Sequence, residues 1–222
     1  MLFSKALEIV KNFNDYGTKT LDYILSTYIT EGQAKVIKEL LSILEPYDYM
    51  LIGGYAVSFY YKGARPVSPE DIDIKIDPNQ AEELLKVLQS KGFKMLRKNF
   101  DPASQSQWVI VKKGSQQADI GFASKPWEFE ALSKPKVFYY YGIKVKVIPP
   151  EYSIITKLFA GRQKDLRDVV FLLKSGMVDF EKVKKLVRKF LPSMDLEELQ
   201  NLYFYAQKFD DEKVWKIFEG SP

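Results

Sequence analysis

The sequence predicts an α+β fold in which a mixed β-sheet is flanked by helices, with N-terminal helices before it and a helical C-terminal region after it. Apolar residues recur with helical periodicity before residue 47 and again after Pro149-Pro150. Between these regions, residues 71–76 alternate polar and apolar side chains, as a half-buried strand does. Short strand-like segments then follow one another closely up to residue 148, which favours hairpins and a mixed sheet.

The pattern divides the chain into an N-terminal helical segment, 1–46, a core, 47–149, and a helical C-terminal region, 150–222. The core is expected to open with an apolar strand, 49–52, and the glycine turn Gly53-Gly54. Further strands are predicted at 71–76, 93–96, 107–111, 117–122, 137–141 and 143–148. Helices are predicted at 56–61, 80–90, 152–160, 166–174, 180–190 and 196–209, with a last short piece to 218.

Composition restricts the chemistry that the chain can perform. The 222 residues include no cysteine and no histidine, which excludes disulfides, thiolate or imidazole zinc sites, and a Ser-His-Asp triad. Any catalysis must therefore use carboxylates, Lys, Arg, Tyr or Ser, or a metal held by oxygen ligands. No apolar run reaches the roughly 18 residues of a membrane span, so we expect a cytoplasmic protein with no membrane partner. The formal net charge of +4 is compatible with a phosphate-bearing ligand.

One segment combines phosphate-binding and metal-binding features. Two glycines after a strand, Gly53 and Gly54, let backbone amides approach phosphate oxygens at the positive end of the following helix. Asp71 and Asp73 fall on one face of the next strand, and such carboxylates bind hard cations such as Mg²⁺. Asp119 belongs to a later strand with the same alternation. We therefore expect it to complete a set of three carboxylates.

These residues resemble the DNA polymerase beta-like nucleotidyltransferase superfamily, in which a Gly-Gly or Gly-Ser turn precedes an Asp-x-Asp pair and a later single Asp. The resemblance spans about residues 49–170 and implies the α/β nucleotidyltransferase fold for the core. Gly-Gly-x-Ala, an Arg and a Ser before Asp-Ile-Asp, and the later Lys157 with the segment 162–168 look closest to the abortive-infection toxin-like and minimal nucleotidyltransferase branches.

The resemblance implies a role for each site residue. Asp71, Asp73 and Asp119 would be the catalytic carboxylates and metal ligands, with Asp119 holding a second metal or taking the proton of the acceptor hydroxyl. Gly53 and Gly54 would hold the triphosphate, although many members have Ser at the position of Gly54. Further phosphate contacts would come from three residues: Arg65, Ser68 and Lys157.

The implied activity is metal-dependent transfer of a nucleoside monophosphate from an NTP to a hydroxyl acceptor, with release of pyrophosphate and Mg²⁺ or Mn²⁺ as cofactor. The acceptor is open among tRNA, a partner protein and a small molecule, and toxin-antitoxin-like function belongs to the same set of hypotheses. The alternative is a non-catalytic nucleotide-binding or interaction module that retains the nucleotidyltransferase fold.

Other polar and aromatic residues have simpler interpretations that stay open beside the functional ones. The charges of Lys157 and of residues 162–168 also fit an exposed helix pair joined by ion pairs. The lysines and arginine of 182–189 oppose an apolar stripe, so they form a solvated helix face or, alternatively, an RNA contact. The three tryptophans are expected in the core: Trp108, Trp127 and Trp215.

Overall fold

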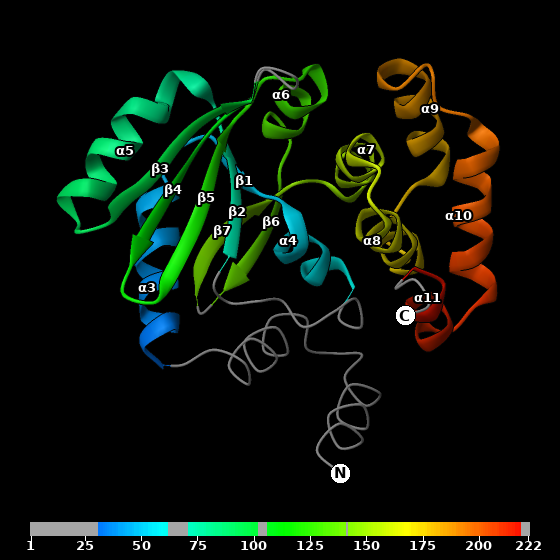
Figure 1. The fold of residues 1–222 in the computed structure, drawn as a ribbon, viewed down its shortest axis with the longest axis horizontal. Coiled ribbons are helices and arrows are strands. Elements are labelled where there is room, and N and C mark those ends of the chain that lie inside the picture. Colours follow the sequence, from blue (N-terminus) through cyan, green and yellow to red (C-terminus); the bar gives the residue numbers. More distant parts are fainter. Residues whose placement is uncertain (1–30, 62–70, 102–105, 141, 219–222) are drawn as a thin grey trace, which may run out of the picture.

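The computed structural model describes residues 31–61, 71–101, 106–140 and 142–218. This part of the chain forms a seven-stranded mixed sheet with the strand order β3-β4-β5-β2-β1-β7-β6 (Figure 1). The pairs β2/β5 and β1/β7 are parallel, and the other neighbouring pairs are antiparallel. The predicted α+β class with a mixed sheet is therefore confirmed. The strands are β1 Tyr49–Leu51, β2 Asp71–Ile76, β3 Lys94–Asp101, β4 Ser106–Lys113, β5 Gln116–Phe122, β6 Lys136–Tyr140 and β7 Ile143–Val147.

Helices cover the sheet and extend beyond one end of it. The helix α6 was not predicted, because it is one short element of seven residues between strands. The C-terminal region is helical throughout its described length, as predicted. The helices are α3 Glu31–Leu44, α4 Gly53–Tyr60, α5 Ala81–Ser90, α6 Pro126–Leu132, α7 Pro150–Ala160, α8 Gln163–Lys174, α9 Phe180–Phe190, α10 Leu196–Lys208 and α11 Asp211–Phe218. None of the described helices is long and apolar enough to cross a membrane.

The two faces of the central strands differ in chemistry. Ile72, Ile74 and Ile76 of β2 are almost completely buried in the hydrophobic core. Helices α3 and α5 lie on that side, where the Lys113 ammonium of β4 bonds the Glu39 carboxylate of α3 at 2.7 Å. The opposite face carries the polar positions of β2, and α4 and α6 lie beside it (Figure 1). Alternation along β2 therefore separates the core from a polar face, as its sequence predicted.

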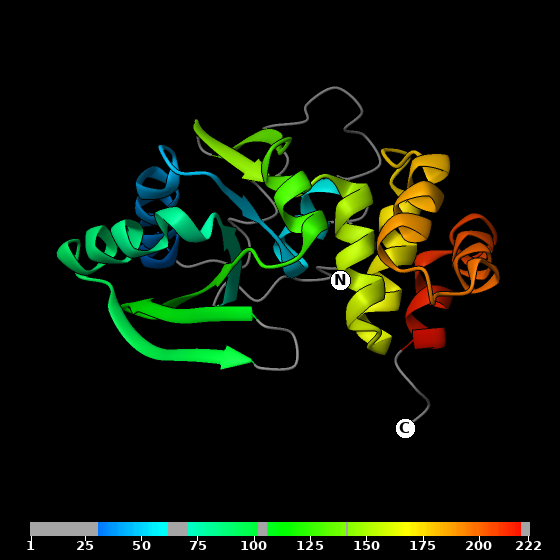
Figure 2. The ribbon, with the colours of Figure 1, turned by 90° about the horizontal axis from the view of Figure 1, so that it is seen from above.

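The C-terminal helices pack against the core through α4 and α6. The Tyr61 ring, directly after α4, stacks on Phe171 of α8 with the ring centroids 5.4 Å apart. The Tyr61 hydroxyl donates a hydrogen bond of 2.8 Å to the Asp211 carboxylate of α11. Figure 2 shows α7 to α11 gathered at the end of the molecule opposite to α3 and α5. Trp127 of α6 also packs against Phe159 of α7 and Phe190 of α9. The polar face thus meets the C-terminal helices at α4 and α6.

Candidate active site

Two predicted carboxylates lie side by side in the sheet. In the parallel pairing of β2 with β5, Asp73 is directly opposite Asp119, and Asp71 is opposite Gln117. Residues directly opposite each other in neighbouring strands share a face, and the strands are about 4.8 Å apart. Asp73 and Asp119 are both half-buried. The amide Nε2 of Gln117 donates a hydrogen bond of 3.2 Å to Oδ1 of Asp119.

The predicted glycine turn is the first turn of α4, and it touches Asp73. The helix begins at Gly53 rather than at Ala56, so both glycines lie at its N-terminus. A Cβ atom at Gly53 would lie 1.9 Å from Oδ2 of Asp73, and the φ angle of Gly53 is +65°. The backbone amide of Ile52 also donates a hydrogen bond of 2.9 Å to the carbonyl of Asp73. Only glycine permits this close approach of a helix N-terminus to the carboxylate.

A buried ion pair borders the carboxylates on the same face. Lys75 follows Asp73 by two positions in β2, and its Nζ lies 2.8 Å from Oε1 of Glu128 in α6. The lysine side chain crosses Gly121 of β5, where an added Cβ would be 3.2 Å from its Nζ. Oε2 of Glu128 accepts hydrogen bonds from the amides of Ser124 and Lys125. The pair therefore fixes the start of α6 beside the polar face.

Sequence reasoning did not identify Lys75 and Glu128. Lys75 is the third polar position in the alternation of β2, after Asp71 and Asp73, and that spacing was a usable signal. Glu128 gave no comparable signal, since its partner Lys75 is 53 positions away and α6 was not predicted.

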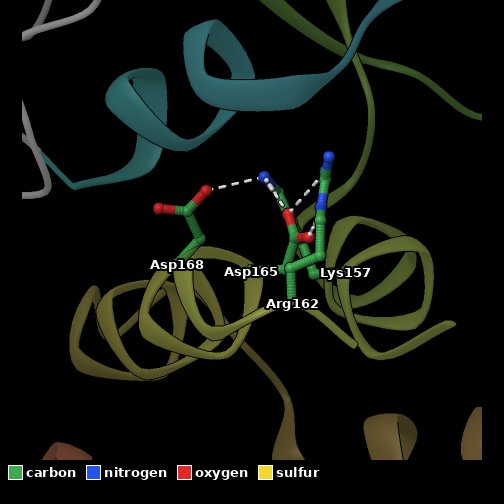
Figure 3. A network of polar contacts seen from close by, with 4 residues as sticks. All are labelled: Lys157, Arg162, Asp165 and Asp168. Carbon is green, nitrogen blue, oxygen red and sulfur yellow. Dashed lines mark hydrogen bonds and ion pairs between the residues drawn. The ribbon is translucent and has the colours of Figure 1, made fainter. Parts of the chain in front are cut away.

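A second polar network lies where α7 meets α8, next to α4 (Figure 3). The Lys157 ammonium lies 3.1 Å from Oδ1 of Asp165 and 2.6 Å from Oδ2 of Asp168. The side chains of Asp165 and Asp168 are only 1% and 0% exposed. Nε of Arg162 donates a hydrogen bond of 2.5 Å to Oδ2 of Asp165. These charges do not form the exposed helix pair that was one interpretation of the sequence, because both carboxylates are buried.

Arg162 lies at the exposed edge of this network, and its charge interacts with that of Asp73 in the sheet. Its hydrogen bond to Asp165 raises the pKa of Arg162, and the charges of Asp165, Asp73 and Asp168 raise it further. Burial acts to raise the pKa of Asp165, but Arg162 and Lys157 outweigh burial and lower that pKa. The Arg162 side chain is 62% exposed. A permanently charged guanidinium is therefore presented at the surface, within electrostatic range of Asp73.

Comparison with known proteins decides the family. Residues 33–216 match the model of a family described as nucleotidyltransferase of unknown function, DUF6036. The chain belongs to this nucleotidyltransferase family. The assignment supports transferase chemistry and agrees with the superfamily that the Gly-Gly and Asp-x-Asp motifs predicted. No curated protein matches the chain.

One solved structure is similar to this chain in fold, and further structures match it with lower scores. The antibiotic-resistance factor ANT(2″)-Ia has a TM-score of 0.53 and 14% sequence identity, with 80% of this chain and all 100% of that chain covered. Two others have lower TM-scores. The lincosamide antibiotic adenylyltransferase LnuA has 0.43, with 17% identity over 65% of this chain and 97% of that chain. JHP933 from Helicobacter pylori has 0.42, with 22% identity over 86% of this chain and 95% of that chain.

The structure of this nucleotidyltransferase brings some of the predicted site residues together. Gly53, Asp73 and Asp119 are neighbours, and Gly54 is the second residue of α4. Lys157 lies in the buried network, where two carboxylates neutralise it. The backbone of Asp71 is in β2, but Arg65 and Ser68 lie outside the described residues. The phosphate contacts of these residues stay predictions.

The donor set of the polar face fits a hard divalent cation. Asp73 and Asp119 offer carboxylate oxygens on one face, and the missing Cβ of Gly53 leaves the Asp73 carboxylate room against α4. Among the side chains that the structure describes, no three acidic groups cluster as a metal site. The side chain of Asp71 is outside the described residues and is therefore not among those side chains. The alternation of β2 puts Asp71 on the same face as Asp73.

We predict that Gly53→Ala destabilises the protein through contact with Asp73. The new methyl group collides with the Asp73 carboxylate, and alanine is strained at a positive φ. Gly176→Ala is the matched control, because Gly176 has a φ of +70° but no atom within 4 Å of an added Cβ. In urea unfolding, Gly53→Ala should lower the free energy of unfolding by at least about 1 kcal/mol more than Gly176→Ala does. Equal losses would show that the contact with Asp73 is unimportant for stability.

We also predict that Lys157→Met destabilises the protein by about 3–5 kcal/mol, because it leaves the Asp168 carboxylate buried without its cation. Adding Asp168→Asn should restore part of the loss. Lys164→Met, at an exposed position of α8, should change the free energy of unfolding by less than about 0.5 kcal/mol. The measurement is again urea unfolding. Unchanged stability of Lys157→Met would contradict a structural role for this ion pair.

Proposed function

We propose that this nucleotidyltransferase moves a nucleoside monophosphate from a nucleoside triphosphate to a hydroxyl acceptor and releases pyrophosphate. The observation that carries the proposal is the contact of Asp73 with Gly53 at the start of α4, with Asp119 directly opposite Asp73. A helix N-terminus, which is suited to phosphates, thereby meets carboxylates, which are suited to metal ions. Neither the helix N-terminus nor the carboxylates alone would support nucleotidyl transfer.

The triphosphate would bind at the N-terminus of α4. Ile52 occupies the N-cap position and its side chain makes no capping hydrogen bond. The first amides of a helix have no partner within the helix, and Gly53 and Gly54 put no side chain in the way of phosphate oxygens. Arg162 adds a cation within electrostatic range of Asp73.

Asp71, Asp73 and Asp119 would hold Mg²⁺ or Mn²⁺, and the bound metal would neutralise the negative charge of the phosphates. Asp119 would accept the proton of the acceptor hydroxyl. The hydroxyl oxygen forms a new bond to the α-phosphorus, the bond from the α-phosphorus to the β-phosphate oxygen breaks, and pyrophosphate leaves with that electron pair. The hydrogen bond from Gln117 holds the Asp119 carboxylate in place for this role.

The test is calorimetric titration with each of the common nucleoside triphosphates, with and without Mg²⁺. Asp73→Asn keeps the shape of the side chain and removes its charge, so metal-dependent triphosphate binding should weaken by about 100-fold or more. Asp179→Asn is the matched control, since Asp179 caps α9 through Lys182 and asparagine caps equally well. Its affinity for the triphosphate should equal that of the wild type.

Catalysis needs a second readout. Pyrophosphate release from the bound triphosphate should depend on a hydroxyl-bearing acceptor mixture and should be lost in Asp119→Asn. If triphosphate binds but no acceptor mixture from the cell yields pyrophosphate, the chain is a nucleotide-binding module and the proposed transfer is wrong.

A further inference from the structure

The sheet face that carries Asp73 and Asp119 continues beyond them onto β4 and β3. Residues directly opposite one another in neighbouring strands share a face, so each row of paired residues can be followed across the sheet. Each row starts at an aspartate of β2 and ends at a basic residue of β3. The two rows are Asp71, Gln117, Lys112 and Lys94, and Asp73, Asp119, Ile110 and Arg97.

Burial along β4 confirms which side these residues occupy. Val109 and Val111 are 0% and 1% exposed and belong to the core on the side of α3. The alternate positions, Trp108 and Ile110, are half-buried, and Lys112 is exposed. In Figure 2, α5 lies above β3 and β4, and no drawn helix of the described chain lies beneath them. Lys94 and Arg97 of β3 are exposed as well, so the extension of the carboxylate face carries exposed basic side chains within the described part of the chain.

This extension is basic. Lys94 lies directly opposite Lys112, an arrangement of like charges that destabilises a sheet unless an anion offsets it. No acidic residue occurs in residues 94–97 or 107–113. A surface cavity of about 340 Å³ lies at the end of β3 and β4 and is lined by Gly92, Lys94, Leu96, Lys112, Lys113 and Gly114. The Lys113 ammonium is already paired with Glu39 on the α3 side of the sheet.

Trp108 adds an aromatic surface to the same face. It is opposite Gly121 in β5, and it lies outside the hydrophobic core cluster, so the prediction that it is a core residue was wrong. Trp127, by contrast, is buried as predicted, and Trp215 is partly buried against the core. An aromatic ring beside basic groups is the usual composition of a surface for single-stranded nucleic acid.

We propose that the basic surface formed by Lys94, Arg97 and Lys112, with Trp108, binds the backbone of a nucleic-acid strand whose terminal hydroxyl is the acceptor at Asp119. The proposal rests on the proposed nucleotidyl transfer, because Asp119 receives the proton of that hydroxyl. Strands β4 and β3 lie about 5 and 10 Å from β5, which puts the basic groups within reach of the phosphates next to the strand terminus. A polycationic small molecule would be repelled here.

The basic face of α9 is the rival surface. Several of its charges are already neutralised: Lys182 pairs with Glu151 at 3.2 Å, Lys184 pairs with Glu181, and Lys189 pairs with Glu130. Lys94 and Lys112, in contrast, face each other. The balance of charge therefore favours β3 and β4 over α9 as the surface that binds the acceptor.

The test uses a short fluorescein-labelled single-stranded RNA and fluorescence anisotropy between about 50 and 200 mM salt. The variant Lys94→Gln/Arg97→Gln/Lys112→Gln should bind at least about tenfold more weakly. The slope of log K against log salt should fall by about 2, since each lost phosphate contact on a single strand removes about 0.7. The control variant Lys185→Gln/Arg188→Gln/Lys208→Gln removes the same charge from exposed positions of α9 and α10 and should bind as the wild type does.

Three results would overturn the proposal: no RNA binding by the wild type at low salt, unchanged binding by the β3–β4 variant, or a loss confined to the control variant. A DNA strand of the same sequence, run in parallel, shows whether the sugar is also recognised. Circular dichroism checks the fold of each variant.

A final pair of measurements separates this proposal from the proposed function. The β3–β4 variant should bind nucleoside triphosphate as tightly as the wild type, while its rate of transfer to RNA falls. Asp73→Asn should retain RNA binding and lose metal-dependent triphosphate binding. If triphosphate binding fails in the wild type but the RNA result holds, the transfer chemistry is wrong and the nucleic-acid surface stands.

Discussion

Two carboxylates lie side by side in neighbouring parallel strands, and three features of the surrounding structure act against the repulsion between them. Asp73 and Asp119 are directly opposite each other in β2 and β5. Like charges in that position destabilise a sheet. The positive end of α4 meets Asp73 at Gly53, Gln117 donates to Asp119, and Arg162 lies within electrostatic range of Asp73. The same cationic and amide groups that offset this repulsion are suited to bind the phosphates of a nucleotide.

The C-terminal helices carry a network of charged side chains next to α4. Lys157 and Asp168 form a buried pair between α7 and α8, and Arg162 lies at the exposed edge of the same network. Removing one partner of such a pair costs more than the pair itself contributes, because it leaves a buried charge uncompensated. The network therefore holds the junction of α7 and α8 in one arrangement against α4.

The central strands separate two kinds of environment. Ile72, Ile74 and their neighbours face α3 and α5 and form a core that excludes water. The other face begins with carboxylates on β2 and β5 and continues with basic residues on β4 and β3. An acidic centre beside a basic extension suits a reaction in which a metal-bound triphosphate meets a polyanionic acceptor. A single sheet face would then hold both substrates.

The sequence by itself determined the α+β class, the Gly53-Gly54 turn, and the alternation that puts Asp73 and Asp119 on polar strand faces, because local period and residue type specify these features. It also indicated the superfamily, which the family match confirmed. Only the tertiary structure decided that β2 and β5 are parallel neighbours, that Lys75 pairs with Glu128, and that Lys94 faces Lys112. Strand order and register depend on contacts between distant parts of the chain, and no local pattern encodes them. The carboxylates could be found in the sequence, but the surface beside them could be found only in the folded sheet.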